Sequence, residues 1–427
     1  MNDVAHVASW YAATAAPSPR RPPLQGARRV DAVVIGGGFT GLSAALRIAQ
    51  AGRSVALLEA RRVGWGASGR NGGLLIPGHR REPGHLIAAF GPQDARRLWD
   101  FGLAACDSLT RTVSTHAIAC DLTLSGHVYA AANRRHLGEL ARERDAIAGI
   151  FNDHAIEMLD RDGVAAHLPA SPYPGGWRDP RGGHFHPLNY ALGLARAAEA
   201  AGAVVHEASP VRALTTGRSI RVATGEGSVE AEIGVLASDA ELTVLEPSLA
   251  GMIMPVSASI VATEPLGQRL DQNLPTRAAI SNTRFVLDYF RPTADGRILF
   301  GGGEKYSPRP PADPEAFVRP FLERALPALA GVRLDYGWSG VVSITRTRNP
   351  VFGRRGGLVW AGGYSGHGAI LAGFSGALAA EAALGLSDAF DLFSRFPQAR
   401  FPGGPLARDP LYVAGMIYYA LRDRLGV

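Results

Sequence analysis

Residues 31–60, DAVVIGGGFTGLSAALRIAQAGRSVALLEA, constrain the fold more than any other stretch of this chain. Apolar runs predict strands over residues 31–35 and 54–59, and the spacing of apolar residues between them predicts a helix over 39–51. A strand, a helix and a strand within about 30 residues form a βαβ unit, whose two strands lie parallel in one sheet. We therefore expect an α/β fold that opens with a parallel sheet.

The turn inside this unit carries the pattern Gly36-x-Gly38-x-x-Gly41. Glycines there allow the backbone N–H groups and the positive end of the helix to approach a pyrophosphate. Glu59 ends the second strand about twenty residues later, where a carboxylate binds ribose hydroxyls. Glycines alone could merely turn a tight corner, but this context favours a dinucleotide site for NAD or FAD.

Two further glycine-rich segments favour FAD over NAD. GWGASGRNGG, residues 64–73, follows Glu59 closely, and GYSGHG, residues 363–368, opens a predicted helix near the end of the chain. A flavin needs contacts along its ribityl chain and ring. A helix N-terminus near the flavin N1 and C2 carbonyl would stabilise the negative charge of the reduced ring.

The rest of the chain predicts two interleaved domains, because 427 residues exceed the usual size of a single core. The order of predicted strands and helices gives a Rossmann-type FAD-binding domain with a parallel sheet and a β-meander. It also gives a substrate-binding domain with a large antiparallel or mixed sheet. We assign residues 1–27 to an extended N-terminal arm, 28–90, 181–245 and 350–390 to the FAD-binding domain, 91–180 and 246–349 to the substrate-binding domain, and 391–427 to a C-terminal extension.

Composition argues against several other classes of protein. The formal charge is +6, but the basic residues are scattered and do not alternate with aromatic ones, so we expect no nucleic-acid partner. Cys106 and Cys120 cannot form a disulfide framework. His184 and His186 have no apparent third ligand, so we expect no metal. No signal peptide or membrane-spanning run is apparent, which predicts a cytoplasmic protein without a membrane span.

The chain resembles the D-amino-acid-oxidase-like FAD-dependent oxidoreductases, which include sarcosine oxidase and glycine oxidase, and it is most similar to the gamma-glutamylputrescine oxidase branch. The segments that carry the resemblance span nearly the whole chain: SWYAATA, VVIGGGFTGLSAAL, LEARRVGWGASGRNGG, HPLNYALGLARAAEAAGA, YFRPTADGRILFGGG, GYSGHG and FPGGPLARDPLYVAGMIYYALRD. The resemblance implies oxidation of a C–N bond in an amine or amino acid. Hydride would pass from the substrate carbon to flavin N5, water would hydrolyse the imine, and O2 would be reduced to H2O2.

The resemblance also implies where FAD is bound. Where sarcosine oxidase has a cysteine bonded to the flavin, the segment GVVSITRTRNPVFG has none, so we expect non-covalent FAD. The branch usually has Gln at the position of Leu74, which would lie near the flavin. The predicted FAD contacts are Gly36, Gly38, Phe39, Thr40, Gly41, Glu59, Ala60, Arg61, Gly66, Ala67, Ser68, Arg70, Asn71, Gly72, Gly73, Leu74, Val211, Gly363, Gly366, His367 and Gly368.

Lys305 and His367 are candidate catalytic residues. Lys305 is the only lysine among 44 basic residues, and it follows three glycines at the end of a predicted strand. A lysine in a similar context in sarcosine oxidase promotes the reaction with oxygen, because a fixed ammonium stabilises the negative charge that oxygen gains. Lys305 could instead be an ordinary exposed lysine. His367 would orient the turn near the flavin ring.

The strand LDYFRP supplies two candidate lining residues, Tyr289 and Phe290, for an apolar, partly aromatic substrate cavity. Alternation places Tyr289 and Arg291 on one strand face and Phe290 on the other. Tyr289 is a candidate catalytic and substrate residue, or a plain core residue. Arg291 could pair with a substrate carboxylate, or could be a surface arginine in a strand-end turn. Trp338, Tyr364 and His79 complete the candidate substrate residues.

Three alternatives to an oxidase stay open. The chain could be an FAD-dependent dehydrogenase that passes electrons to an acceptor other than oxygen, or a flavin-binding subunit without turnover. A nicotinamide-dependent dehydrogenase is a more distant alternative. The resemblance implies gamma-glutamylputrescine as substrate, but other amines stay open, and the sequence does not predict the oligomeric state.

Overall fold

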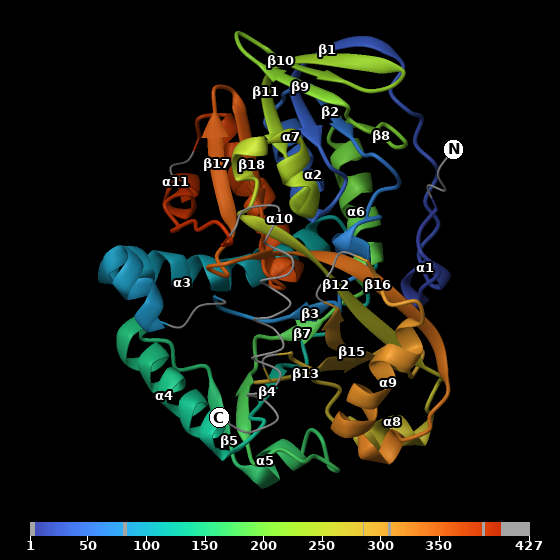
Figure 1. Cartoon of the computed structure of the whole chain (residues 1–427), viewed down its shortest axis with the longest axis vertical. Helices are drawn as coiled ribbons and strands as arrows, with labels where there is room; N and C mark the ends of the chain where they lie inside the picture. The colour runs from blue at the N-terminus through green and yellow to red at the C-terminus, as the bar shows by residue number, and fades with distance from the viewer. Residues whose placement is uncertain (1–4, 80–82, 285, 306–308, 387–388, 403–427) are drawn as a thin grey trace.

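A computed structural model describes residues 5–79, 83–284, 286–305, 309–386 and 389–402, with only the backbone at 304 and 305. Its strands form two eight-stranded sheets and one two-stranded sheet. Figure 1 shows the first large sheet in the upper half of the molecule and the second in the lower half. Helices pack against both.

The first large sheet contains the predicted βαβ unit. Its strand order is β17-β18-β11-β1-β2-β8, and the central strands run parallel. As the alternating sequence predicts, β9, β10 and β11 form an antiparallel meander. The bounds are β1 Gly26–Ile35, β2 Val55–Leu58, β8 Val204–His206, β9 Ala213–Thr216, β10 Ile220–Ala223, β11 Gly227–Leu236, β17 Val351–Arg355 and β18 Leu358–Gly362. Every residue of β2 and β18 is buried, as is typical of parallel sheets covered on both faces.

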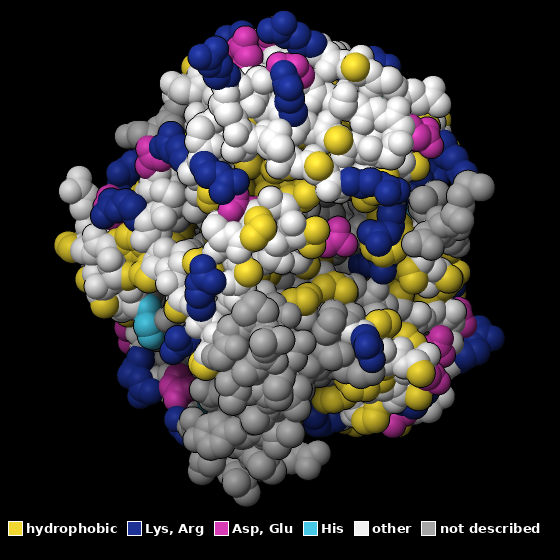
Figure 2. Space-filling model, turned by 45° about the horizontal axis from the view of Figure 1, so that its top comes forward, with side chains coloured by type: hydrophobic (Ala, Val, Ile, Leu, Met, Phe, Trp, Pro, Cys, Tyr) yellow, Lys and Arg dark blue, Asp and Glu magenta, His cyan; other side chains and the backbone are white. Residues whose placement is uncertain are grey.

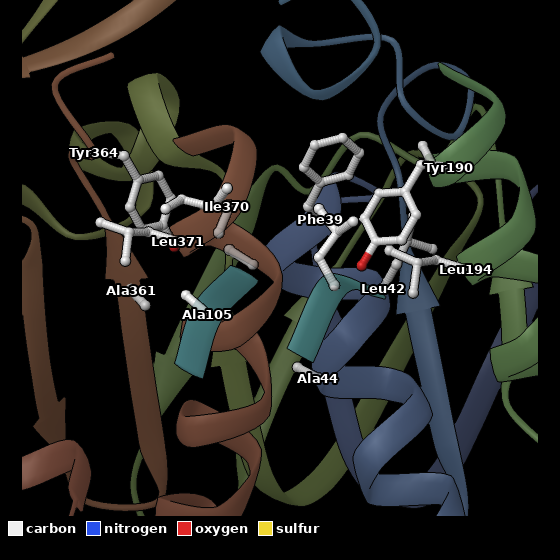
Figure 3. Packing of buried hydrophobic residues seen from close by; sticks show 14 of the residues in the cluster. Phe39, Leu42, Ala44, Ala105, Tyr190, Leu194, Ala361, Tyr364, Ile370 and Leu371 are labelled. Carbon is white, nitrogen blue, oxygen red and sulfur yellow. The ribbon is translucent and has the colours of Figure 1, made fainter. Parts of the chain in front are cut away.

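Helices α2 Phe39–Gln50, α6 Pro187–Ala200 and α10 Gly368–Ala383 pack beside one another against this sheet. Small residues allow α2 and α10 to approach closely, since a Cβ atom added to Gly376 would lie 2.0 Å from the carbonyl oxygen of Thr40. Figure 3 shows the apolar side chains between these helices, among them Phe39 and Tyr190, whose rings pack edge to face. The hydrophobic core of the first-sheet half therefore includes the residues at the N-terminal end of α2.

The second large sheet has the order β16-β12-β15-β14-β13-β4-β6-β5 and is mixed, because β4 and β13 run parallel while the other pairs are antiparallel. The bounds are β4 His127–Ala130, β5 Glu157–Leu159, β6 Gly176–Asp179, β12 Ile253–Thr263, β13 Ala279–Asn282, β14 Tyr289–Pro292, β15 Ile298–Lys305 and β16 Leu334–Thr345. Helix α9, Pro314–Ala325, covers one face; Asp313 caps it and Pro314 is its first residue.

The other helices lie around these two layers. They are α3 Pro83–Thr115, α4 Arg134–Phe151, α5 Arg161–Ala165, α7 Leu242–Leu245, α8 Gln268–Asn273 and α11 Ala389–Ser394. Helix α3 contains a break at Gly91, whose φ is 76°. This helix crosses the predicted domain boundary at residue 90, and the boundaries stay a prediction. Strands β3 Leu74–Leu75 and β7 Gly183–His184 pair between the two large sheets (Figure 1).

The N-terminal arm differs from the prediction. We expected an extended segment over residues 1–27, but residues Trp10–Ala13 form a short helix, α1, with Ser9 as its N-cap. The side chains of Trp10 and Tyr11 are 2% and 0% exposed. The ring of Tyr11 packs edge to face on Trp338 of the second sheet, with 5.2 Å between the ring centroids. Burial of these two aromatic rings stabilises the short helix, and the local sequence alone does not indicate this burial.

Among the described residues, no helix has the length and apolar content to cross a membrane. Figure 2 shows the basic side chains of one face in separate groups, with acidic and hydrophobic side chains between them.

Candidate cofactor and substrate site

The turn after β1 requires its glycines for reasons internal to the protein. Gly36 has φ +112°, and a Cβ atom there would lie 2.5 Å from the carbonyl oxygen of Ala237. A Cβ atom on Gly41 would lie 1.8 Å from the carbonyl oxygen of Gly36. Gly38 is the N-cap of α2 and offers no side chain to cap it. The N-terminal end of a twelve-residue helix thus faces the end of the parallel sheet, where such folds bind pyrophosphate.

Glu59 lies beside this turn at the end of β2. Its carboxylate accepts hydrogen bonds from the backbone N–H groups of Gly37, at 2.6 Å, and Arg61, at 2.8 Å. Burial raises the pKa of the Glu59 carboxyl, against the opposing effect of these two bonds. The N–H of Ser209 donates to the carbonyl of Glu59, which brings the segment before Val211 alongside the same strand end.

The second glycine-rich segment packs directly on the first. The N–H of Gly64 donates to the carbonyl of Gly37 at 2.9 Å, and the hydroxyl of Ser68 accepts from the N–H of Phe39 at 3.0 Å. Ser68 therefore lies at the N-terminal end of α2, where a phosphate would be bound. Both residues are predicted FAD contacts, and this hydrogen bond brings them together.

Most glycines of the second segment are required by contacts within the protein, not only by the approach of a cofactor. A Cβ atom would lie 2.1 Å from the carbonyl oxygen of Gly64 if added to Gly69, and 2.2 Å from that of Phe185 if added to Gly73. A Cβ atom on Gly72 would lie 2.6 Å from the ring of Tyr289. Gly66, in contrast, faces open space, with nothing within 4 Å of an added Cβ atom.

Buried side chains from distant parts of the chain hold the end of this segment. Three successive carbonyl groups each accept one hydrogen bond: that of Arg70 from Trp338 Nε1 at 3.0 Å, that of Asn71 from the Tyr11 hydroxyl at 2.7 Å, and that of Gly72 from Arg291 Nε at 2.7 Å. We call residues 70–73 the pinned loop. The Asn71 side chain closes it from within, because its Oδ1 accepts from the N–H of Gly73 at 2.8 Å.

Tyr289 and Arg291 lie on one face of β14, as alternation predicts. The ring of Tyr289 passes over Gly301 of the neighbouring strand, where an added Cβ atom would lie 2.0 Å from the ring, and it also contacts Gly72. Phe290 lies on the other face, stacked on Phe300 in the core below α9, so its predicted place in the cavity wall is wrong. Tyr289 is therefore the aromatic side chain of β14 that lies beside the pinned loop.

Arg291 is 2% exposed, so it is not a surface arginine. Besides the Gly72 carbonyl, its guanidinium donates to the Pro292 carbonyl at 3.0 Å and to the Tyr11 hydroxyl at 3.3 Å. Among the described residues, no carboxylate forms an ion pair with it. We predicted that Arg291 and Trp338 contact the substrate. In the structure both donate hydrogen bonds to carbonyls of the pinned loop.

The third glycine-rich segment contacts the chain just after the second segment, at Gly78. His367 is the N-cap of α10, and its Nε2 lies 3.3 Å from the carbonyl oxygen of Gly78. Tyr364 lies beside the start of α10, near Ile370 and Leu371 (Figure 3), and its hydroxyl is 2.7 Å from Thr40 Oγ1 of α2. Tyr364 thus joins the two nucleotide-site helices through its side chain, and its predicted contact with substrate stays a prediction.

Leu74, His79 and Lys305 lie at the edges of the site. Leu74 is buried in β3, paired with His184 of β7. The ring of His79 stacks on Phe396, with centroids 5.4 Å apart, which places it against the segment after α11. Lys305 is the last residue of β15 and pairs with Ser257 of β12. The side chain of Lys305 lies outside the described part of the chain. So do residues 403–427, which include most of the C-terminal segment that carries the family resemblance.

Sequence reasoning missed Tyr11. SWYAATA contributed to the family resemblance, but we assigned it to an extended arm. The available signal was a pair of aromatic residues, Trp10 and Tyr11, in a segment otherwise rich in Ala and Pro, since aromatic residues in such a segment need a place to be buried.

Acidification is expected to destabilise the protein through His184 and His186. Burial, and then the positive charge of Arg291, lower the pKa of both to about 3, from 6.5. Below pH 6.5 these two histidines take up protons in the unfolded chain but not in the folded protein. The stability that their neutral forms contribute is therefore fully present above pH 6.5 and is lost as the pH falls toward 3. His186→Gln should reduce the pH slope of the unfolding free energy, measured in urea, by about 1.4 kcal/mol per pH unit near pH 5. The exposed His154→Gln is the control, and an unchanged slope in His186→Gln would contradict the expectation.

These residues fit an FAD. The N-terminal end of α2, the Glu59 carboxylate and Ser68 would hold the adenosine and pyrophosphate, and the pinned loop and the start of α10 would face the flavin half.

The described residues contain no group of three or more His, Cys, Asp or Glu side chains placed to hold a metal. Cys106 and Cys120 are buried, and burial raises the pKa of both thiols, to about 12 for Cys120. Because the thiolate is the reactive form, neither cysteine is suited to forming a covalent bond with the flavin.

Comparisons with known proteins agree with this cofactor. Residues 31–382 match the family model of DAO, FAD dependent oxidoreductase. The chain is 37% identical over 425 residues to gamma-glutamylputrescine oxidoreductase of Escherichia coli (strain K12), covering 99% of each chain. It is 36% identical over 419 residues to the probable oxidoreductase OrdL of Rhizobium meliloti (strain 1021), covering 97% of each.

Solved structures show the same fold. Glycine oxidase from Geobacillus kaustophilus superposes with a TM-score of 0.73 at 22% identity, over 88% of this chain and 100% of that one. L-proline dehydrogenase from P. horikoshii gives 0.70 at 20% identity, over 84% and 93%. The predicted two-domain α/β fold and FAD cofactor are confirmed, and the chain belongs to the D-amino-acid-oxidase-like family of FAD-dependent oxidoreductases.

Proposed function

We propose that this enzyme is an FAD-dependent oxidase of an amine or amino acid that transfers electrons to oxygen and releases hydrogen peroxide. The observation that carries the proposal is the meeting of the pinned loop with Tyr289 of the second sheet. There the predicted flavin site borders an aromatic side chain of the predicted substrate side. When bound, FAD would take a hydride from the carbon beside the substrate nitrogen and pass two electrons to oxygen.

The residues around the site would bind and orient the substrate. Contacts on both sides restrict the ring of Tyr289, between Gly72 and Gly301, so it can present a fixed aromatic surface to a substrate. We propose that Arg291 and Trp338 act on the reaction by holding the pinned loop, and not by contact with the substrate. This assignment follows from their hydrogen bonds to the carbonyls of Gly72 and Arg70.

Lys305 is proposed to assist the reaction with oxygen. Its backbone position, at the end of β15 and opposite Ser257, lies on the strand that Tyr289 crosses at Gly301. An ammonium group held near the flavin would stabilise the negative charge that oxygen gains as it is reduced. A compact, fixed charge suits this task better than the broad guanidinium that the chain uses elsewhere.

We propose gamma-glutamylputrescine, or an amine of similar shape, as the substrate. The support is the similarity over almost the full length to a protein named gamma-glutamylputrescine oxidoreductase. The buried Arg291 already donates to the backbone carbonyls of Gly72 and Pro292, which favours an amine whose reacting end carries no adjacent carboxylate. Leu74, where the branch usually has Gln, leaves room for a different amine.

A substrate screen tests this function. Purified enzyme is mixed anaerobically with gamma-glutamylputrescine, primary diamines, N-methyl amino acids and D-amino acids, and flavin bleaching is followed. Air is then admitted and hydrogen peroxide is measured. We expect gamma-glutamylputrescine or a related primary amine to bleach the flavin fastest and to yield peroxide. Bleaching without peroxide, but with reduction of an artificial acceptor, would favour the dehydrogenase; the absence of bleaching by any amine would favour a flavin-binding subunit.

A further inference from the structure

The three hydrogen bonds to the pinned loop determine which way its peptide groups point. In a planar trans peptide the N–H points opposite to the C=O. With the carbonyls of residues 70–72 directed at Trp338, Tyr11 and Arg291, the N–H groups of residues 71–73 must therefore point to the opposite side of the loop.

Two of these three N–H groups are already bonded within the loop. That of Asn71 donates to the carbonyl of Ala67 at 3.1 Å, and that of Gly73 donates to the Asn71 side chain at 2.8 Å. The N–H of Gly72 has no acceptor among the described residues. It belongs to the same peptide group whose carbonyl accepts from the Tyr11 hydroxyl, so Tyr11 orients this donor.

Tyr11 is well placed to hold one peptide group rigidly. Its side chain is fully buried, and its ring packs edge to face on Trp10, His186 and Trp338. Its hydroxyl both donates to the carbonyl of Asn71 and accepts from Arg291, which leaves it little freedom to rotate.

The arm that carries Tyr11 is tied to the start of α6. The hydroxyl of Thr14 lies 3.1 Å from His186 Nε2, and the N–H of Ala16 donates to Asn189 Oδ1 at 2.7 Å. On the other side, Trp10 Nε1 donates to Asp295 of the second-sheet half at 3.0 Å. The arm thus bridges both halves of the molecule at the point where Tyr11 meets the pinned loop.

We propose that Tyr11 is a positioning residue of the cofactor site, and that its hydroxyl fixes the Asn71–Gly72 peptide so that the Gly72 N–H donates to the flavin. The N-terminal arm is then part of the FAD site, although it lies outside the nucleotide motif in sequence. FAD is the established cofactor of the family, so this inference does not depend on the amine substrate or on oxygen.

The test compares Tyr11→Phe with Tyr173→Phe. Both changes remove one buried hydroxyl, but Tyr173 accepts a hydrogen bond from Asn282 Nδ2 at 3.0 Å in the core of the second half, away from the pinned loop. The apoprotein of each variant is titrated with FAD, and the dissociation constant, the visible flavin spectrum and the midpoint potential of the bound flavin are measured. Thermal unfolding of the apoprotein is measured in parallel.

Tyr11→Phe should raise the FAD dissociation constant about tenfold, the effect of one buried hydrogen bond. It should also shift the flavin spectrum and make the midpoint potential more negative. Tyr173→Phe should lower the unfolding temperature while leaving all three flavin properties at their wild-type values. The proposal is overturned if Tyr11→Phe has the wild-type dissociation constant, spectrum and potential.

Trp338→Phe keeps the test decisive if Tyr11→Phe does not fold. It removes the N–H that binds the carbonyl of Arg70 and keeps an aromatic ring in place. We expect a rise of about tenfold in the FAD dissociation constant here as well. Where Tyr11→Phe folds, the double variant should show less than the product of the two effects, because both side chains act on one loop. A wild-type flavin site in Trp338→Phe would overturn the view that the carbonyl contacts position the loop.

Discussion

Replacing Lys305 with Met is expected to slow the reoxidation of the reduced flavin by oxygen about a hundredfold, the usual cost of removing one group that stabilises developing negative charge. Anaerobic reduction by the amine substrate should keep its rate, because hydride transfer needs a neutral amine and correct stacking and not this charge. Stopped-flow absorbance of the flavin measures the two half-reactions separately. Lys305 pairs with Ser257 through its backbone, so the substitution should leave strand β15 in place.

Lys305→Arg is the matched variant, because it keeps the positive charge on a longer, planar group. We expect it to retain part of the oxygen reactivity, between that of Lys305→Met and the wild type. If Lys305→Met reacts with oxygen at the wild-type rate, Lys305 has no role in that step. If both half-reactions slow equally, the residue supports the site as a whole and not the oxygen reaction.

Replacing Glu59 with Gln is expected to raise the FAD dissociation constant about a hundredfold, equivalent to about 2.7 kcal/mol. The carboxylate now accepts from two backbone N–H groups, those of Gly37 and Arg61, and would also bind the ribose hydroxyls. An amide has a single acceptor oxygen, and its NH2 group would face one of these donors. Fluorescence titration of the apoprotein with FAD measures the change.

Glu246→Gln is the control for this prediction. Glu246 is also fully buried, and its carboxylate pairs with Arg355 and accepts from Ser248, away from the nucleotide turn. Glu246→Gln should lower the unfolding free energy and leave FAD affinity unchanged. Equal FAD affinities of Glu59→Gln and the wild type would show that Glu59 only closes the turn and does not contact the ribose.

Local sequence was enough to predict the nucleotide half of the site. The strand, the glycine turn, helix α2 and Glu59 lie within residues 26–59, and the hydrogen bond from Gly37 to Glu59 joins the two ends of this unit. Alternation on β14 likewise predicted that Tyr289 and Arg291 share a face, because a strand has a period of two wherever it pairs.

Contacts between distant segments could not be predicted in the same way. The glycines at 72 and 73 indicated close approach, but the sequence did not show that the approaching atoms belong to Tyr289 and Phe185. The sequence allowed Arg291 to be a substrate ligand or a surface residue, but it did not show that Arg291 donates to the carbonyl of Gly72. Tyr364 was correctly placed in a glycine-rich turn, yet its partner is Thr40, more than three hundred positions away.

The sequence by itself determined the family, the cofactor and the parallel βαβ unit, because each depends on residue types at short, regular spacing. The tertiary structure alone decided what holds the pinned loop. Its carbonyls are bound by side chains from the N-terminal arm, β14 and β16, which are up to about 330 residues apart and meet only when the two sheets pack together. Tyr11, which the sequence placed in an extended arm, is buried there beside the site.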